Sequence, residues 1–423
     1  MEILWELIDL LGKMSVNSIH EFTNYGTRLR SFCAAFALCL CMSPVSGAEN
    51  GVAVSPATAT LSYRNELRHA IDRGLSWLES SQNSNGWWST PDQPAVTSLA
   101  LMAFQGEPTG RFHRNEPAFL SRSYAYLNSC IQPDGGIHRS NLVTYNTSIS
   151  MMALLTSKKA EFEPTILRAR RFLVGLQSDF GEKGKLDSPF DGGIGYGSKY
   201  EHSDMGNTLQ ALEAIYYSKY LLRQDKSAEK PDANLNYASA IHFLQNCQNL
   251  PNYNKESWAS DAPENKGGFV YYPGHSMAGS VTNATTGRVS LRSYGSISYG
   301  GLLSYIYAEM DRQDPRVVAV FDWLRRNYTV QENPAMGEQG LYYYYFTMTK
   351  ALTLYGAKEL ELADGRKASW RKELSQRLLN LQRENGSWAN SNARWWENDP
   401  VLVTSYVVQS LEMIERGLES AGE

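Results

Sequence analysis

Residues 382–388 read Gln-Arg-Glu-Asn-Gly-Ser-Trp, and an apolar, helically periodic run over residues 404–414 follows them after a loop. Gly386 can adopt the positive φ that ends a helix, and Thr404 suits the N-cap of the next helix. The stretch therefore predicts two helices joined by a glycine-marked turn. Neither helix would bury its apolar face alone, so we expect this hairpin to stack against copies of itself.

Degenerate copies of the same hairpin precede it along the chain. Their turns are marked by a glycine at positions 86, 136, 193, 268 and 340, with Gly386 as the last. The uneven spacing indicates loops of different length on one face, where repeat proteins usually carry function. An open array needs polar units at both ends, yet the first and last copies are as apolar as the others. We predict an all-α fold, an α/α toroid of six helix hairpins in a twelve-helix ring, with an open superhelix as the alternative.

Composition narrows the class of protein. The chain has 423 residues, of which 42% are hydrophobic and 20% charged, which suffices for a large core. A formal net charge of −4 without a concentrated basic face argues against nucleic acid as a partner. Only Cys130 and Cys247 lie outside the N-terminal segment, so the chain is no disulfide scaffold. Their hairpins are not neighbours in the predicted ring, so we expect both thiols to be unpaired.

The N-terminal segment has the order of features of an export signal. Arg28 and Arg30 precede the apolar run 32–42, and small residues follow at 46–48. We expect residues 1–48 to be an N-terminal extension and signal peptide, 49–63 a linker, and 64–423 the toroid domain. The protein would then be exported, to the periplasm or beyond the cell, with no stable membrane span after signal removal. A retained N-terminal anchor is the alternative, and the sequence leaves the oligomeric state open.

The pattern Gln-x-x-x-Gly-x-Trp at residues 82–88 and 382–388, with Gly-Gly copies between, resembles the repeat of the prenyltransferase and squalene-oxidosqualene cyclase superfamily. The runs 291–295 and 340–345 are similar to those of secreted bacterial prenyltransferase/squalene-oxidase repeat proteins. The resemblance implies a toroid with an isoprenoid-related role. The Asp-x-Asp-Asp run of triterpene cyclases is absent from this sequence. The stretches that hold zinc in protein prenyltransferases carry none of its ligands here, so we expect no metal and no cofactor.

Aromatic side chains near the turns and before a late helix are the candidates for ligand binding: Tyr342, Tyr343, Tyr344, Tyr345, Trp395, Trp396, Trp88 and His138. Their faces can line a pocket for a carbocation or an isoprenoid tail. They can equally stack sugars or pack between helices, and the tryptophan pair suits either a ligand platform or a lid.

Two sets of residues are candidates for catalysis. Arg292 and Tyr294 precede a late helix, where an Arg that neutralises a uronate beside a Tyr base would suit a polysaccharide lyase; capping and packing explain them too. His202 and Asp204 lie on one loop and His138 on the equivalent loop of another hairpin, so they are candidates to converge as a metal or acid–base site. Loop histidines are more often simply solvated.

Three hypotheses for function remain. The first is an isoprenoid-related enzyme or binding protein with an aromatic central cavity, whose partner is an apolar small molecule. The second is an extracellular polysaccharide-active enzyme, whose partner is a glycan. The third is a non-catalytic interaction scaffold that kept the fold.

Overall fold

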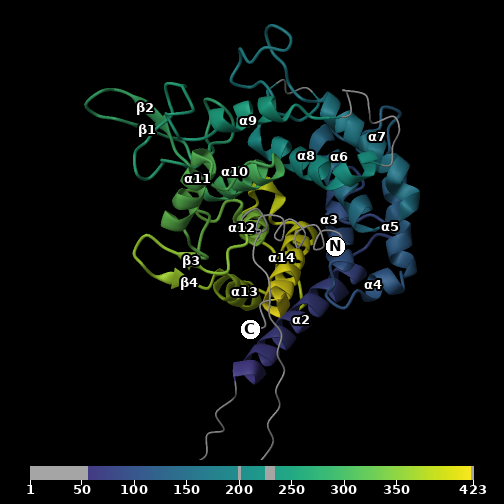
Figure 1. Ribbon diagram of the computed structural model, residues 1–423. Coiled ribbons are helices and arrows are strands. Elements are labelled where there is room, and N and C mark those ends of the chain that lie inside the picture. The colour runs from purple at the N-terminus through teal and green to yellow at the C-terminus, as the bar shows by residue number, and fades with distance from the viewer. Residues whose placement is uncertain (1–55, 199–201, 224–233, 421–423) are drawn as a thin grey trace, which may run out of the picture.

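The computed structural model describes residues 56–198, 202–223 and 234–420, in which twelve helices form two concentric layers (Figure 1). The outer helices are α2 (Pro56–Ser80), α5 (Ala118–Asn128), α7 (Glu163–Gly175), α9 (Tyr237–Asn246), α11 (Pro315–Arg326) and α13 (Trp370–Asn380). The inner helices are α3 (Pro94–Gln105), α6 (Val143–Thr156), α8 (Met205–Ser218), α10 (Gly295–Tyr307), α12 (Leu341–Leu354) and α14 (Pro400–Ser420). Each outer helix and the inner helix after it form one hairpin.

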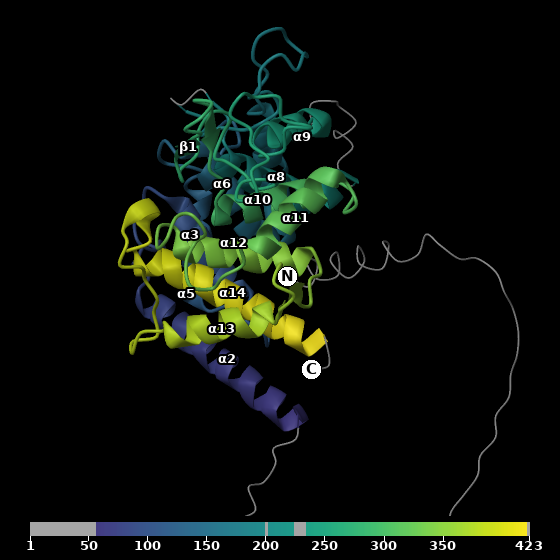
Figure 2. The ribbon, with the colours of Figure 1, turned by 90° about the vertical axis from the view of Figure 1, so that its left-hand side faces the viewer.

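The inner helices close into a ring. Each contacts the next in chain order from α3 to α14, and α14 in turn contacts both α3 and α2. Figure 1 shows the first helix, α2, beside the last, α14, and Figure 2 shows the same helices from the side. A continuous apolar core fills the space between the two layers. The predicted α/α toroid of six hairpins is therefore confirmed, and the open superhelix is excluded.

The remaining elements lie in the connections. They are the short helices α4 (Arg111–Arg114), η1 (Ala160–Phe162), η2 (Lys219–Arg223) and η5 (Arg394–Trp396), and the strands β1 (Ser280–Thr282), β2 (Val289–Leu291), β3 (Leu360–Glu361) and β4 (Lys367–Ala368). Strands β1 and β2 pair antiparallel, as do β3 and β4. No helix in the described ranges has the length and apolar character needed to cross a membrane.

The glycine of each turn packs against the following hairpin. Gly386 has a φ of +92°, and a Cβ there would lie 2.6 Å from the carbonyl oxygen of Arg73 on α2. The Gln382 side chain donates to the carbonyl of Ala70 on the same helix, at 2.9 Å. The turn of the last hairpin thus packs closely against the first outer helix, α2, and this contact helps to close the ring.

The positive-φ glycine is not always the one the sequence pattern indicated. In the three copies with a glycine pair it is the first of the pair, at 135, 192 and 267, instead of 136, 193 and 268. Gly340 also has a positive φ, but it begins α12 and makes no turn of this kind. Only the first glycine of each pair takes the left-handed conformation that lets the chain leave the outer helix.

A hydroxyl from the inner helix holds each of these turns. The backbone N–H of Trp388 donates to Thr404 Oγ1 at 3.0 Å, and that of Trp88 donates to Thr97 Oγ1 at 3.0 Å. The same bond recurs at Ile137–Thr147, Ile194–Thr208 and Phe269–Ser298. Thr404 lies inside α14, which begins at Pro400, so its expected role as an N-cap is wrong. Its hydroxyl satisfies the turn instead.

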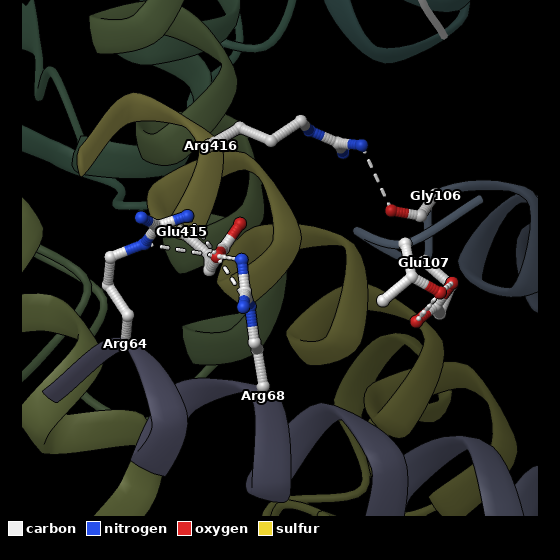
Figure 3. A network of polar contacts seen from close by, with 7 residues as sticks. Arg64, Arg68, Gly106, Glu107, Glu415 and Arg416 are labelled. Carbon is white, nitrogen blue, oxygen red and sulfur yellow. Dashed lines mark hydrogen bonds and ion pairs between the residues drawn. The ribbon is translucent and has the colours of Figure 1, made fainter. Parts of the chain in front are cut away.

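Charged side chains join the two ends of the ring. Figure 3 shows Arg64 and Arg68 of α2 reaching Glu415 of α14, with nitrogen–oxygen distances of 2.9 and 2.6 Å. On the other side of α14, Arg416 donates to the carbonyl oxygen of Gly106 at 3.0 Å. The last helix is therefore held by polar contacts to both helices of the first hairpin.

Glu412, one turn before Glu415 and Arg416 on α14, makes the stability of the folded protein depend on pH. It is fully buried and neither of its carboxyl oxygens has a hydrogen-bond partner. Burial raises its pKa well above the ordinary value, Arg416 opposes the rise, and the nearby carboxyls of Glu107 and Glu415 add to it. In the unfolded chain this carboxyl loses its proton near its usual pKa of about 4.3, whereas the folded chain keeps it to higher pH. Stability therefore falls as pH rises from about 4 towards the folded pKa.

We expect Glu412→Gln to be more stable than the wild type at pH 7.5 and to match it near pH 4. Glutamine does not ionise, so the variant does not lose stability at this position as pH rises. Urea unfolding at the two pH values measures this. Glu415→Gln is the matched control, and it should destabilise because Glu415 is ion-paired with Arg64 and Arg68. An equal loss at both pH values for Glu412→Gln would contradict the prediction.

Other expectations from the sequence can be compared with the structure here. Helix α2 begins at Pro56, so the linker expected over residues 49–63 is wrong for 56–63. The expected signal peptide lies outside the described residues. Cys130 and Cys247 are buried and free, as expected.

Candidate functional site

A cavity of about 430 Å³ opens where the inner helices begin. Residues at or near the N-terminal end of each of the six inner helices line it, from Gln93 beside α3 to Tyr406 on α14. Eight lining side chains are aromatic: Tyr145, Tyr196, Tyr271, Tyr294, Tyr343, Tyr406, Trp395 and Trp396. The volume is within the range of about 300–1,000 Å³ for small-molecule sites.

Tyrosine pairs form much of the wall. The hydroxyls of Tyr145 and Tyr406 lie 3.1 Å apart, and those of Tyr196 and Tyr271 lie 3.0 Å apart. Burial raises the pKa of Tyr145 and Tyr406, so both stay neutral in the ordinary pH range. Because the hydroxyls satisfy one another, the wall presents mainly ring faces and edges to a ligand.

Asp204 lies behind this wall at the N-terminus of α8. Its carboxyl oxygens accept from the backbone N–H of Asn207 at 2.9 Å and from its side-chain amide at 2.7 Å. Tyr271, which lines the cavity, lies close enough to Asp204 for each group to act on the pKa of the other. Burial raises the pKa of Asp204, and these hydrogen bonds oppose the rise. A buried carboxyl thus lies near Tyr271 and its hydrogen-bonded partner Tyr196 in the cavity wall.

Glu397 is the one carboxylic acid among the lining residues. It comes from the loop before α14, yet its Oε1 accepts from the backbone N–H of Tyr343 at 2.7 Å, so it caps the neighbouring helix α12. Its Oε2 accepts from Asn390 at 2.7 Å. Burial raises the pKa of Glu397 against these hydrogen bonds. The residue joins two hairpins at the mouth of the cavity.

At the N-termini of other inner helices, side-chain oxygens likewise accept hydrogen bonds from backbone N–H groups. Asn146 Oδ1 accepts from Ala95 at the start of α3 at 3.0 Å, and Asn333 Oδ1 accepts from Ser296 of α10 at 2.9 Å. Asp399 Oδ1 accepts from Val401 of α14 at 2.8 Å. The N-termini of helices attract anions through such free N–H groups, and here protein acceptors already bind them.

Trp395 and Trp396 rim the cavity in an unusual backbone conformation. Both have positive φ, 55° and 65°, and are 45% and 47% exposed. Arg394 stacks on Trp395, with its guanidinium carbon 4.5 Å from the ring centroid. It also bonds to Gln339 and to the sulfur of Met277. Bulky residues seldom take this conformation without a functional reason.

The structure brings together four of the residues that the sequence predicted for a site. Tyr294, Tyr343, Trp395 and Trp396 all line the cavity, and Asp204 lies behind it, close to the lining residue Tyr271. Of the tyrosine run at the start of α12, only Tyr343 lines it. Consecutive helical residues point about 100° apart, so Tyr342, Tyr344 and Tyr345 turn away from the lumen. Tyr344 and Tyr345 donate to the carbonyls of residues 329 and 330, each at 2.7 Å.

The other predicted residues are not at the cavity. Trp88 is fully buried and its indole N–H donates to the Leu78 carbonyl at 2.7 Å, so it is a core residue. Arg292 is exposed and lines no part of the wall. The expected pairing of Arg292 with Tyr294 is therefore not formed.

The predicted histidine site is not assembled either. His138 stacks on Phe172 and His202 on Tyr272, with ring centroids 6.3 and 4.4 Å apart. Neither lines the cavity. The described part of the chain contains no group of three His, Cys, Asp or Glu side chains that could hold a metal ion. Each imidazole packs against an aromatic side chain of the following hairpin, His138 against α7 and His202 against the connection between α9 and α10.

Sequence reasoning missed Tyr145, Tyr196, Tyr271, Tyr406 and Glu397. A signal existed for two of them: Tyr145 is two residues before Thr147 and Tyr406 two after Thr404, the hydroxyl residues that mark the inner helices. No local pattern indicates the other three, because they come from irregular loops.

Solved structures share this architecture. A variant of the type II terpene cyclase MstE from Scytonema, in complex with geranylgeranyl dihydroxybenzoate as substrate, has 13% sequence identity and a TM-score of 0.52, over 84% of this chain and 99% of that one. Cellobiose 2-epimerase from Bacillus thermoamylovorans has 11% identity and a TM-score of 0.51, over 84% and 100%. Neither a protein-family model nor a curated protein sequence matches the chain. At these identities the likeness shows the α/α toroid alone.

Proposed function

We propose that the protein binds an apolar ligand of the isoprenoid type in the central cavity. The observation that carries the proposal is the wall itself: eight aromatic side chains surround a volume of about 430 Å³. Aromatic rings give a large apolar contact area to hydrocarbon tails and attract carbocations through their faces. The repeat pattern at residues 82–88 and 382–388, which resembles prenyltransferase/squalene-oxidase repeats, supports the same class of ligand.

The alternatives are weaker. A polysaccharide lyase of the predicted type needs Arg292 beside Tyr294, and Arg292 lies outside the cavity. A pure interaction scaffold needs no lumen, yet each inner helix contributes to one. Export remains a proposal that rests on residues 28–48 of the sequence.

A second candidate function is proton transfer to or from the bound ligand. The nearness of the buried acid Asp204 to Tyr271, which is hydrogen-bonded to Tyr196 in the cavity wall, favours it. Groups of this kind act as general acids or bases when a substrate is placed against them. Tyr271→Phe removes this hydroxyl and keeps the ring, so it should abolish turnover of any substrate found while ligand binding changes little.

The binding proposal is tested by filling the cavity. Ile297 lines it on α10, and Ile297→Trp should lower the affinity for farnesol at least about tenfold by occupying the ligand's volume. Quenching of the intrinsic tryptophan fluorescence measures the affinity, and native mass spectrometry of the purified wild type reports any lipid carried from the source. Val318→Trp is the control, because Val318 is 39% exposed on the outer helix α11. Equal farnesol binding by both variants would place the ligand elsewhere.

A further inference from the structure

We propose that the cavity selects its ligand by charge: it accepts an isoprenoid chain with a neutral or cationic head group and excludes one with a carboxylate or diphosphate. The inference rests on the proposed function and names the chemical class of the ligand. It differs from the expectation for a prenyl-diphosphate site, which needs cations to hold the phosphates.

The first observation is the lack of a positive side chain in the wall. Within the described ranges, no Lys, Arg or His lines the cavity. Arg394 at the rim is already bound to Gln339 and Met277 and stacked on Trp395. Arg394 keeps its charge, because these partners are neutral, but it lies exposed at the rim. Lys350 of α12 forms an ion pair with Glu213 of α8 and is not a lining residue. An anionic head group among the lining residues would therefore lose its water without a cation in the wall to pair with, which is strongly unfavourable.

The second observation concerns the helix ends. The inner helices direct their N-termini to the cavity, and free N–H groups there would bind an anion. Instead, Asp204, Glu397 and Asp399 accept hydrogen bonds at three of these ends, from α8, α12 and α14. Asn146 and Asn333 do the same for α3 and α10. The protein's own acceptors use the positive ends of the dipoles, and several of those acceptors are carboxyls.

The third observation concerns the acidic and aromatic side chains at the cavity. Glu397 borders the cavity and Asp204 lies behind Tyr271, both buried. Tyrosine and tryptophan faces carry negative potential and attract cations. The described residues also offer no group of three His, Cys, Asp or Glu side chains for a metal ion to which a diphosphate would bind. The environment thus favours a positive head group over a neutral one, and a neutral one over a negative one.

Four probes with one tail test the order: farnesylamine, farnesol, farnesoic acid and farnesyl diphosphate. We expect farnesylamine to bind at least as tightly as farnesol, and the two anions to bind at least about tenfold more weakly than farnesol. Fluorescence quenching at pH 7.5 measures each affinity, and Ile297→Trp corrects for binding outside the cavity. Binding of either anion as tight as that of farnesol would overturn the charge inference and leave the proposed function standing. Absence of binding by all four would overturn both.

A variant that introduces a positive charge provides a second test of the inference. Leu142 lines the cavity at the start of α6 and is half-buried, so a lysine there can keep its ammonium group hydrated at the rim. We expect Leu142→Lys to tighten farnesoic acid binding about tenfold while farnesol binding stays within about twofold. Leu142→Met, of similar size and no charge, should change neither. Unchanged binding of farnesoic acid by a folded Leu142→Lys protein would count against electrostatic exclusion.

Discussion

Gly192→Ala is expected to unfold much of the protein at ordinary temperature. Gly192 has a φ of +85°, and a Cβ at this position would lie 1.9 Å from the carbonyl oxygen of Ser239 on α9. A backbone group of a packed helix cannot move aside as a side chain can, so the turn and α9 would have to separate. We expect a loss of more than about 4 kcal/mol in the free energy of unfolding, at the extreme of single substitutions.

Gly184 provides the matched control. It has a φ of +80° and nothing within 4 Å of its would-be Cβ. Gly184→Ala therefore carries the conformational strain alone, about 1–2 kcal/mol. Urea unfolding followed by circular dichroism compares the two. If both variants lost the same stability, the cost would come from φ alone, and the close contact between turn and helix would have no energetic role.

Trp388→Ala is expected to have the second largest effect. Trp388 is fully buried and its indole N–H donates to the Leu378 carbonyl at 2.8 Å. Its removal leaves a cavity between the layers and takes from the Leu378 carbonyl one of its two hydrogen bonds, the other coming from the Leu381 N–H, and we expect a loss of about 3–5 kcal/mol. Trp396→Ala should cost less than about 1 kcal/mol, because that side chain is 47% exposed.

The two tryptophans should differ in the opposite sense for ligand binding. Trp396 lines the cavity and Trp388 does not. Trp396→Ala is therefore expected to weaken farnesol binding while the fold stays intact. Thermal unfolding and the binding assay, run on both variants, separate the roles. A strongly destabilised Trp396→Ala protein would show that the rim loop is part of the core.

The loop residues that line the cavity come from the hairpins that depart most from the repeat pattern. The fifth hairpin lacks the Gln and the positive-φ turn glycine; its Asn333 caps α10 of the hairpin before it, and Glu397 from the hairpin after it caps its own inner helix α12. The long connection in the fourth hairpin supplies Tyr271 and Met277, and the loop before α14 supplies the tryptophan pair. Regular turns hold the ring together, and the irregular connections shape the site.

The turn chemistry was legible in the sequence because it is local. Gly386 after an apolar helix has the positive φ that was expected of it. The role of the following hydroxyl was not predicted, since Thr404 was expected to be an N-cap and instead accepts from the turn. Repetition of this unit, with apolar ends, was enough to predict six hairpins in a closed ring. The sequence also led us to expect a functional face on the side of the glycine-turn connections, and the candidate cavity opens where those connections enter the inner helices.

The direction of each side chain was decided only by the tertiary structure. Whether Tyr343 or its neighbours face the lumen depends on the rotation of α12, which is set by packing against α10 and α14. Glu397 and Asn333 cap helices of other hairpins, and Arg64 meets Glu415 across nearly the whole chain. Such contacts join residues far apart in sequence, so no local pattern encodes them. They exist only once the ring has closed, and they decide which polar groups remain for a ligand.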